Sequence, residues 1–143
     1  MTRFPRRKKT ILVLDDEDID VTAACQILWH EGYAVLEADC YKRAINVFES
    51  NRDLVDLLVA DISLPDGDAC DLALRVKDRQ PYLRVLFVSG HVGAEVCRFY
   101  GLDQTDLHFL RKPFTAEQLI ASVQRVFRAS ERFPRLHAKT RTA

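Results

Sequence analysis

The stretch ILVLDDEDID (residues 11–20) joins four apolar residues to a segment that carries five carboxylates. Its first half has the composition of a buried β-strand. Its second half packs like charges so densely that they repel one another. Such a concentration of negative charge after a strand indicates that the carboxylates have a function at the strand's carboxyl end.

Four further apolar runs follow at a steady pitch along the chain. Three of the five runs are nearly continuous in Val, Leu, Ile and Phe, which is typical of strands covered on both faces in a parallel sheet. The five predicted strands are TILVL (10–14), YAVLEA (33–38), LVDLLVA (54–60), LRVLFVS (83–89) and LHFLR (107–111).

The segments between these strands have helical periodicity. Helices are predicted over residues 17–31, ending at Gly32, and over 41–50, 69–79 and, with the weakest pattern, 93–101. A last helix begins at Thr115, with Gln118 three residues later as a capping box. Strand and helix alternate five times in one domain, which predicts a doubly wound α/β fold with right-handed crossovers.

The chain has 143 residues and a formal net charge of zero, but its charge is unevenly distributed. Residues 1–9 and 125–143 are basic, and the body between them is acidic. Basic ends are typical of solvated tails, and contact with nucleic acid or an acidic partner is the alternative. No apolar run reaches the ~18–20 residues that span a bilayer, and the run after the basic start is too short for a signal peptide. We therefore expect a soluble, cytoplasmic protein.

The four cysteines and four histidines are scattered along the chain. A zinc site requires clustered ligands, so this spacing argues against thiol–metal chemistry. We expect the cysteines to be small, buried or half-buried apolar residues in a reducing compartment.

Polar residues follow four of the five predicted strands. They are Asp15 and Asp16 after the first strand, Asp61 after the third, Ser89 and Gly90 after the fourth, and Lys112 and Pro113 after the fifth. In a doubly wound sheet, ligands bind at the carboxyl ends of the strands. An Asp-Asp pair alone is also typical of a helix N-cap with a solvated neighbour. The matching residues on the other strands favour a shared site.

Three aspartates at one rim need a cation. Two carboxylates ~4 Å apart repel by about 4 kcal/mol at an effective dielectric constant near 20. Oxygen ligands without His or Cys suit Mg²⁺, and Mn²⁺ is possible. Glu17, Asp18 and Asp20 are expected to face water in the first helical turn, where the helix dipole favours negative charge. Because X-Pro bonds can be cis, the Lys112–Pro113 bond can direct the lysine inward.

Residues 9–130 resemble the receiver domain of two-component response regulators. The resemblance rests on the acidic pair, Asp61, the Pro65/Gly67 loop, Ser89-Gly90 and Lys112-Pro113, in that order. It implies a flavodoxin-like (βα)5 fold with a five-stranded parallel sheet in the order 2-1-3-4-5. It also implies a receiver domain over residues 10–130, between basic tails at 1–9 and 131–143.

The resemblance implies a role for each site residue. Asp61 would accept a phosphoryl group from a phosphohistidine. Mg²⁺ would be held by Asp16, Asp61 and the backbone carbonyl of Ser63, with Asp15 acting through water. Lys112 and Ser89 would contact the phosphoryl oxygens, helped by the N–H of Gly90. These donors stabilise charge.

Phe109 occupies the family's switch position, which is often Tyr or His. Its ring could move into the space that Ser89 vacates, or it could be an ordinary core residue. Ser63 and His91 flank the route of a hydrolytic water, and Ala69 stands where a Gly is common.

The implied partners are a sensor histidine kinase or a histidine phosphotransfer protein, and an unidentified downstream protein. We expect a signalling domain that catalyses its own phosphorylation and dephosphorylation, without direct DNA or membrane binding. Two alternatives stay open: a degenerate receiver that only docks, and an Asp-x-Asp phosphatase, whose spacing Asp16-Glu17-Asp18 mimics. The phosphatase reading lacks a following Asp-Gly-Thr and a cap domain.

Overall fold

The computed structural model describes residues 7–64, 66–90 and 107–132. Five parallel strands form one sheet: β1 (Thr10–Leu14), β2 (Ala34–Ala38), β3 (Val55–Asp61), β6 (Arg84–Ser89) and β7 (Leu107–Arg111). Their order is β2-β1-β3-β6-β7. Counted in chain order within this sheet, that is the predicted order 2-1-3-4-5. The predicted doubly wound fold is confirmed.

The labels β4 (Ser63–Leu64) and β5 (Gly67–Asp68) belong to a separate antiparallel pair of two-residue strands. This β4–β5 hairpin connects β3 to the following helix and was not predicted from the sequence. Strands of two residues have no alternating pattern long enough to detect. The hairpin begins two residues after Asp61.

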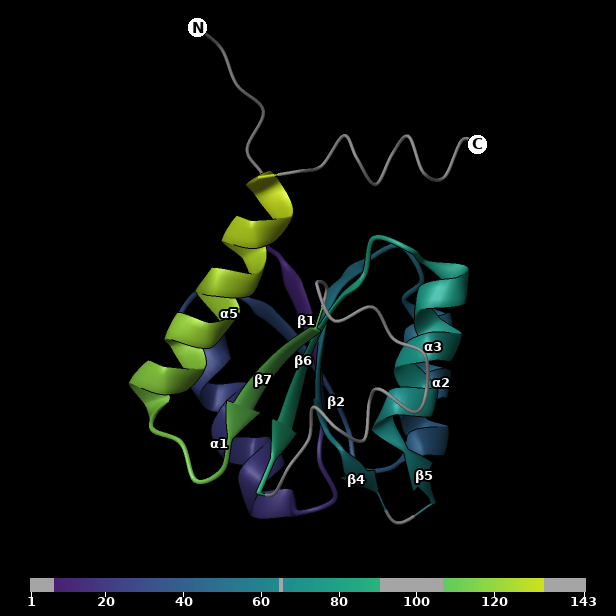
Figure 1. Cartoon of the computed structure of the whole chain (residues 1–143), viewed down its shortest axis with the longest axis horizontal. Coiled ribbons are helices and arrows are strands. Elements are labelled where there is room, and N and C mark those ends of the chain that lie inside the picture. The colour runs from purple at the N-terminus through teal and green to yellow at the C-terminus, as the bar shows by residue number, and fades with distance from the viewer. Residues whose placement is uncertain (1–6, 65, 91–106, 133–143) are drawn as a thin grey trace, which may run out of the picture.

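Four helices lie within the described residues, and they cover both faces of the sheet (Figure 1). The pair α1 (Asp18–His30) and α5 (Ala116–Arg132) lies on one face, and α2 (Tyr41–Ser50) and α3 (Ala69–Arg79) lie on the other. All four agree with the predicted helices to within one or two residues at the ends that were predicted. The predicted helix at 93–101 lies outside the described residues.

The core is divided by the sheet into two clusters because successive side chains of a strand point to opposite faces. In β1, Leu12 and Leu14 join the cluster under α2 and α3, whereas Ile11 and Val13 join the cluster under α1 and α5. Strands β3 and β6 alternate in the same way. Burial on both faces explains the nearly continuous apolar runs in the sequence.

Two local signals fix helix ends as the sequence predicted. The hydroxyl of Thr115 accepts a hydrogen bond from the Gln118 N–H (3.1 Å), and the Gln118 side chain accepts one from the Thr115 N–H (2.8 Å). This reciprocal pair is the predicted capping box. After α1, Gly32 has φ +99°, a conformation that glycine adopts without steric cost.

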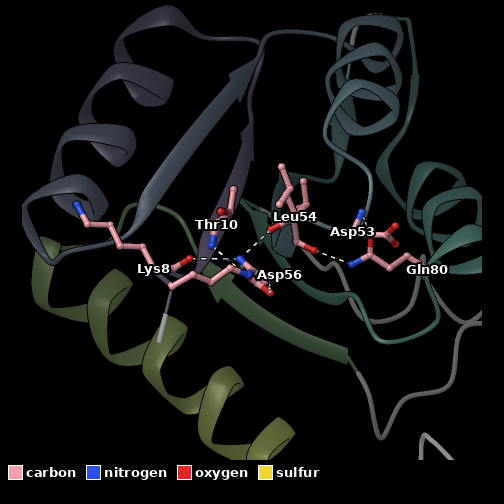
Figure 2. A network of polar contacts seen from close by, with 8 residues as sticks. Lys8, Thr10, Asp53, Leu54, Asp56 and Gln80 are labelled. Atoms are coloured by element: carbon pink, nitrogen blue, oxygen red, sulfur yellow. Dashed lines mark hydrogen bonds and ion pairs between the residues drawn. The ribbon is translucent and has the colours of Figure 1, made fainter. Parts of the chain in front are cut away.

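The amino edge of the sheet is held by a polar network (Figure 2). The Arg7 guanidinium donates to both oxygens of Asp56, at 3.0 and 2.9 Å, and the Thr10 N–H donates to Asp56 Oδ2 at 2.8 Å. Nearby, Gln80 donates to the Val55 carbonyl (2.7 Å) and accepts from the Asp53 N–H (3.2 Å). These contacts tie the starts of β1 and β3 together.

A membrane-spanning helix would need a long apolar stretch, and none of the helices in the described part of the chain has one. Three cysteines lie in that part. Cys70 is buried, and Cys25 and Cys40 are half-buried, as predicted. Burial and the nearby Glu37 carboxylate raise the pKa of the Cys25 thiol to about 12, so this thiol stays protonated at neutral pH.

Candidate functional site

Sheet register brings the first and third strands' aspartates together at the carboxyl edge. Leu14 of β1 pairs with Ala60 of β3, so the next residues along the two strands are Asp15 and Asp61. Asp16 joins them, and one carboxylate oxygen from each of the three lies within 4.8 Å of the others. The structure therefore gathers all three predicted aspartates at one rim.

Lys112 reaches this rim from the end of β7. Its Nζ donates to Asp15 Oδ2 at 2.8 Å and to Asp61 Oδ2 at 3.0 Å. Burial works against the charged ammonium, but the hydrogen bonds to Asp15 and Asp61 outweigh it and raise the pKa of Lys112. The lysine is therefore charged at any physiological pH and offsets part of the rim's negative charge.

Asp20 corrects one expectation. It was expected to face water, but its Oδ2 accepts a third hydrogen bond from Lys112 Nζ at 3.2 Å, and its side chain is 42% exposed. An ammonium has three N–H donors, so three carboxylates occupy all of them. Asp20 is the third residue of α1, in the first turn of the helix that follows the Asp15–Asp16 pair. Its place in the first helical turn after the acidic pair is the sequence signal that could have identified it.

The rim carries more negative than positive charge. Lys112 contacts three carboxylates, and Asp16 adds a fourth. Desolvation, the hydrogen bond with Asp15 and the nearby charges raise the pKa of Asp16. A raised carboxyl pKa means that the ionised form is unfavourable where it stands. The carboxylate trio is thus a site that a hard cation would stabilise.

The donor chemistry of the trio fits Mg²⁺. Its oxygens come from carboxylates, and the group contains no histidine or cysteine. Hard divalent cations prefer such oxygens, and Mn²⁺ accepts the same set. Ser63, which was predicted to add its backbone carbonyl, is the first residue of β4, two residues after Asp61.

Ser89 and Lys112 meet where β6 and β7 end. Ser89 pairs with Arg111 in the sheet register, and the Lys112 N–H donates to the Ser89 carbonyl at 2.8 Å. Ser89 is half-buried and Gly90 is exposed. The peptide bond between Lys112 and Pro113 is cis. Both residues predicted to contact phosphoryl oxygens therefore stand at the same edge as Asp61.

Phe109 lies on β7 with its side chain 37% exposed, stacked on the buried Phe87 with ring centroids 5.6 Å apart. Such exposure does not fit an ordinary core phenylalanine. The ring therefore packs on Phe87 and is partly exposed. His91, the other predicted tuning residue, lies outside the described residues.

A cavity of about 410 Å³ adjoins the rim between α1 and the segment that joins β7 to α5. Asp20 and Lys112 form its polar side, and its apolar lining comes from Ala23, Ala24, Ile27, Pro113 and Phe114. The rim therefore opens into a partly apolar hollow that is large enough for a side chain of another molecule.

The sheet order, the acidic rim and the contact of Lys112 with that rim together define a receiver-type α/β domain. The response regulator receiver domain family matches residues 11–124, and the chain belongs to that family. The predicted family is therefore confirmed.

Similar proteins include both kinases and regulators. The chain is 30% identical to the sensor kinase CckA of Brucella abortus over 115 residues, which cover 80% of this chain and 12% of CckA. It is 27% identical to the transcriptional regulatory protein CreB of Escherichia coli over 128 residues, covering 89% of this chain and 54% of CreB. The chain thus spans about half or less of the length of these relatives.

Solved receiver structures have the same fold. The receiver domain of the hybrid histidine kinase CckA is 30% identical, with a TM-score of 0.69 over 82% of this chain and 97% of that one. A response regulator receiver protein from Sinorhizobium medicae is 29% identical, with a TM-score of 0.76 over 86% of this chain and 97% of that one.

Proposed function

We propose that this chain is the phosphoacceptor module of a two-component or phosphorelay pathway, with Asp61 as the acceptor. The observation that carries the proposal is the position of Asp61. Its carboxylate lies in the acidic trio and accepts a hydrogen bond from Lys112, so it combines a nucleophile with the positive charge that an anionic donor requires.

The transfer step conserves atoms and charge. An Asp61 carboxylate oxygen attacks the phosphorus of a phosphohistidine on a sensor kinase or a histidine phosphotransfer protein. The P–N bond breaks, its electron pair returns to the imidazole, and a P–O bond forms. Lys112 lies 3.0 Å from Asp61 Oδ2 and can follow the added negative charge on the phosphoryl oxygens.

Asp16, Asp61 and the Ser63 carbonyl would hold Mg²⁺, with Asp15 acting through water. When bound, the ion supplies positive charge that offsets both the carboxylates and the incoming phosphoryl group. The raised pKa of Asp16 and the grouping of the three carboxylates support this assignment.

Small phosphodonors test the acceptor. Acetyl phosphate with Mg²⁺ should add one phosphoryl group that base or hydroxylamine removes, as for an acyl phosphate, and intact-mass measurement should detect it. Asp61→Asn should abolish the addition. Label that persists on Ser, Thr or His would contradict the proposal, and absence of label in the unaltered chain would favour a docking module without phosphorylation.

The proposed output is a two-state switch through Ser89, Phe109 and Lys112. The phosphoryl group shifts the population because it binds one form better. Ser89 and Lys112 would contact it in that form, and Phe109, whose ring is part exposed on β7, would move toward Ser89. Partner binding would then change over the surface of β7 and α5.

Beryllofluoride, an acyl-phosphate mimic, tests this switch by NMR. In the unaltered chain, shift changes should extend from the rim into residues 107–127. Ser89→Ala should still allow phosphorylation of Asp61 and should reduce the distant changes. Changes confined to the rim in the unaltered chain would mean a phosphoryl carrier without a switch.

A further inference from the structure

Among the residues that the structure describes, backbone hydrogen bonds of Ile62 hold the base of the β4–β5 hairpin. The Ile62 N–H donates to the Val88 carbonyl at 3.1 Å, and the Ala69 N–H donates to the Ile62 carbonyl at 3.2 Å. Beyond these bonds, Ser63 pairs with Asp68 and Leu64 with Gly67. Ser63 lies one residue beyond Ile62, so the contacts at the far end of the hairpin also influence the position of its backbone.

Asp66 ties that far end to α2. Its Oδ1 accepts from the Tyr41 N–H at 2.7 Å, and its Oδ2 accepts from the Lys42 N–H at 3.2 Å. The N-cap residue of α2, Cys40, makes no side-chain capping bond, and the first turn of α2 has no acidic residue. Asp66 thus caps, from 25 residues away, a helix that does not cap itself.

Tyr41 closes the same contact from the helix side. Its ring lies against Gly67 so closely that a Cβ there would stand 2.6 Å from Tyr41 Cδ2. Its hydroxyl donates to Asp71 Oδ2 on α3 at 2.7 Å and accepts from Arg75 at 3.3 Å. The hairpin tip is therefore fixed between the amino ends of α2 and α3.

The base of the hairpin is fixed at α3 by a second aspartate. Asp68 is the N-cap of α3, and its Oδ1 accepts from the Cys70 N–H at 2.7 Å. Asp68 also pairs with Ser63, so one capping aspartate holds the hairpin at its turn and the other holds it at the end of β5. A loss at Asp66 would free the turn, to which Ser63 is joined through Leu64, so the Ser63 backbone would be held less firmly. Asp61 in β3 and the α3 cap would stay in place.

We propose that Asp66 is a positioning residue for the metal site: by capping α2 it holds the β4–β5 hairpin so that the Ser63 carbonyl can complete the carboxylate trio. The inference rests on the proposed function, because Ser63 is a metal ligand only there. Asp66 does not contact the ion. It acts through the hairpin, as residues that orient metal ligands do.

Calorimetric titration of the whole chain with MgCl₂ tests the inference, alongside thermal unfolding without metal. Asp66→Ala should weaken Mg²⁺ binding about tenfold, a typical effect of losing a residue that orients a ligand. Asp66→Asn should recover much of the affinity but not all of it, because its single amide oxygen can keep the shorter bond from the Tyr41 N–H and loses the bond from the Lys42 N–H. Failure of this rescue would overturn the capping argument.

Glu49→Ala is the matched control. Glu49 ties α2 to α3 at the opposite end of the helices through an ion pair with Arg79, and it also pairs with Arg52. Its loss should lower stability and leave Mg²⁺ affinity unchanged. Equal weakening in Glu49→Ala and Asp66→Ala would show that affinity merely follows stability, and it would overturn the inference.

Gly67→Ala provides an independent disturbance of the same hairpin and serves also if Asp66→Ala does not fold. The added methyl group must displace Tyr41 or the hairpin, so Mg²⁺ binding should weaken. If both Gly67→Ala and Asp66→Ala bind Mg²⁺ as tightly as the unaltered chain, this inference is overturned and the proposed function is not. An unaltered chain that gives no Mg²⁺ binding would instead overturn the proposed function.

Discussion

Charges are balanced at the amino edge of the sheet and unbalanced at its carboxyl edge. At the amino edge, Asp56 meets the Arg7 guanidinium through two hydrogen bonds and the Thr10 N–H through a third. At the carboxyl edge, Lys112 serves three carboxylates, and Asp16 stands beside them. The single negative charge of Asp56 is neutralised by the single positive charge of Arg7. At the carboxyl edge the negative charges outnumber the positive ones, and a bound cation would offset the excess.

The comparison indicates that charge balance, more than the number of ion pairs, distinguishes a structural contact from a candidate site. The Arg7–Asp56 pair is exposed and bidentate, and it needs no further partner. The rim is half-buried, and its acids are held together by the fold against their repulsion. Four predictions test this difference, beginning with the largest expected effect.

The response to Mg²⁺ should belong to the carboxyl edge alone. In the unaltered chain, millimolar Mg²⁺ should raise the melting temperature, because a ligand that binds only the folded state stabilises it. Asp16→Ala should abolish this rise. Asp56→Asn, the control at the amino edge, should keep it even if the starting melting temperature is lower. A full response in Asp16→Ala would place the ion elsewhere.

Lys112→Ala should destabilise the metal-free protein by about 1–3 kcal/mol, since it leaves crowded, partly buried carboxylates without their positive partner. Added Mg²⁺ should recover much of this loss, because it supplies positive charge to the same oxygens. Chemical denaturation with and without Mg²⁺ measures both effects. An equal loss of stability with and without Mg²⁺ would contradict the view that Lys112 and the metal ion neutralise the same carboxylates.

Arg7→Ala should cost about 0.5–1 kcal/mol, a usual value for an exposed pair of good geometry. The loss should shrink at high salt, because salt screens exposed charges. Arg7→Lys, which keeps the charge and loses the bidentate geometry, should recover only part of it. Mg²⁺ binding should not change in either variant. Any change there would mean that the two edges are coupled.

The smallest expected effect is on pH dependence. The pKa of Asp16 is raised in the folded state, so the folded protein binds this proton more tightly than the unfolded chain does. Without metal, stability should therefore fall as pH rises from the unfolded value near 3.8 through the raised folded value. Asp16→Asn should remove this component and raise the metal-free melting temperature slightly. A steeper fall in the variant would contradict this sign.

Much of the fold could be predicted because its signals are local. The run TILVL coincides with β1, and the Thr115/Gln118 capping box sits at the start of α5 as expected. The residues of the rim could also be predicted, because parallel strands bring their carboxyl ends to one edge. The positions of Asp15, Asp16, Asp61, Ser89 and Lys112 followed from that rule, while their roles remain proposals.

The contacts that escaped prediction join residues far apart in the chain. Lys112 and Asp20 are 92 residues apart. Asp66 caps α2, whose own N-cap residue makes no side-chain capping bond. Arg7, expected in a solvated tail, binds Asp56 across 49 residues. The pattern of neighbouring residues does not indicate which acidic side chain a given basic side chain or helix end will contact.

The sequence by itself determined the alternation of strands and helices, the parallel sheet and the residues at its carboxyl edge, because hydrophobic periodicity and capping depend on near neighbours. Only the tertiary structure decided that Lys112 is shared among three carboxylates, that Phe109 rests half-exposed on Phe87, and that Asp66 secures the hairpin beside Asp61. Those arrangements depend on the three-dimensional packing of elements, which places distant side chains within hydrogen-bond reach.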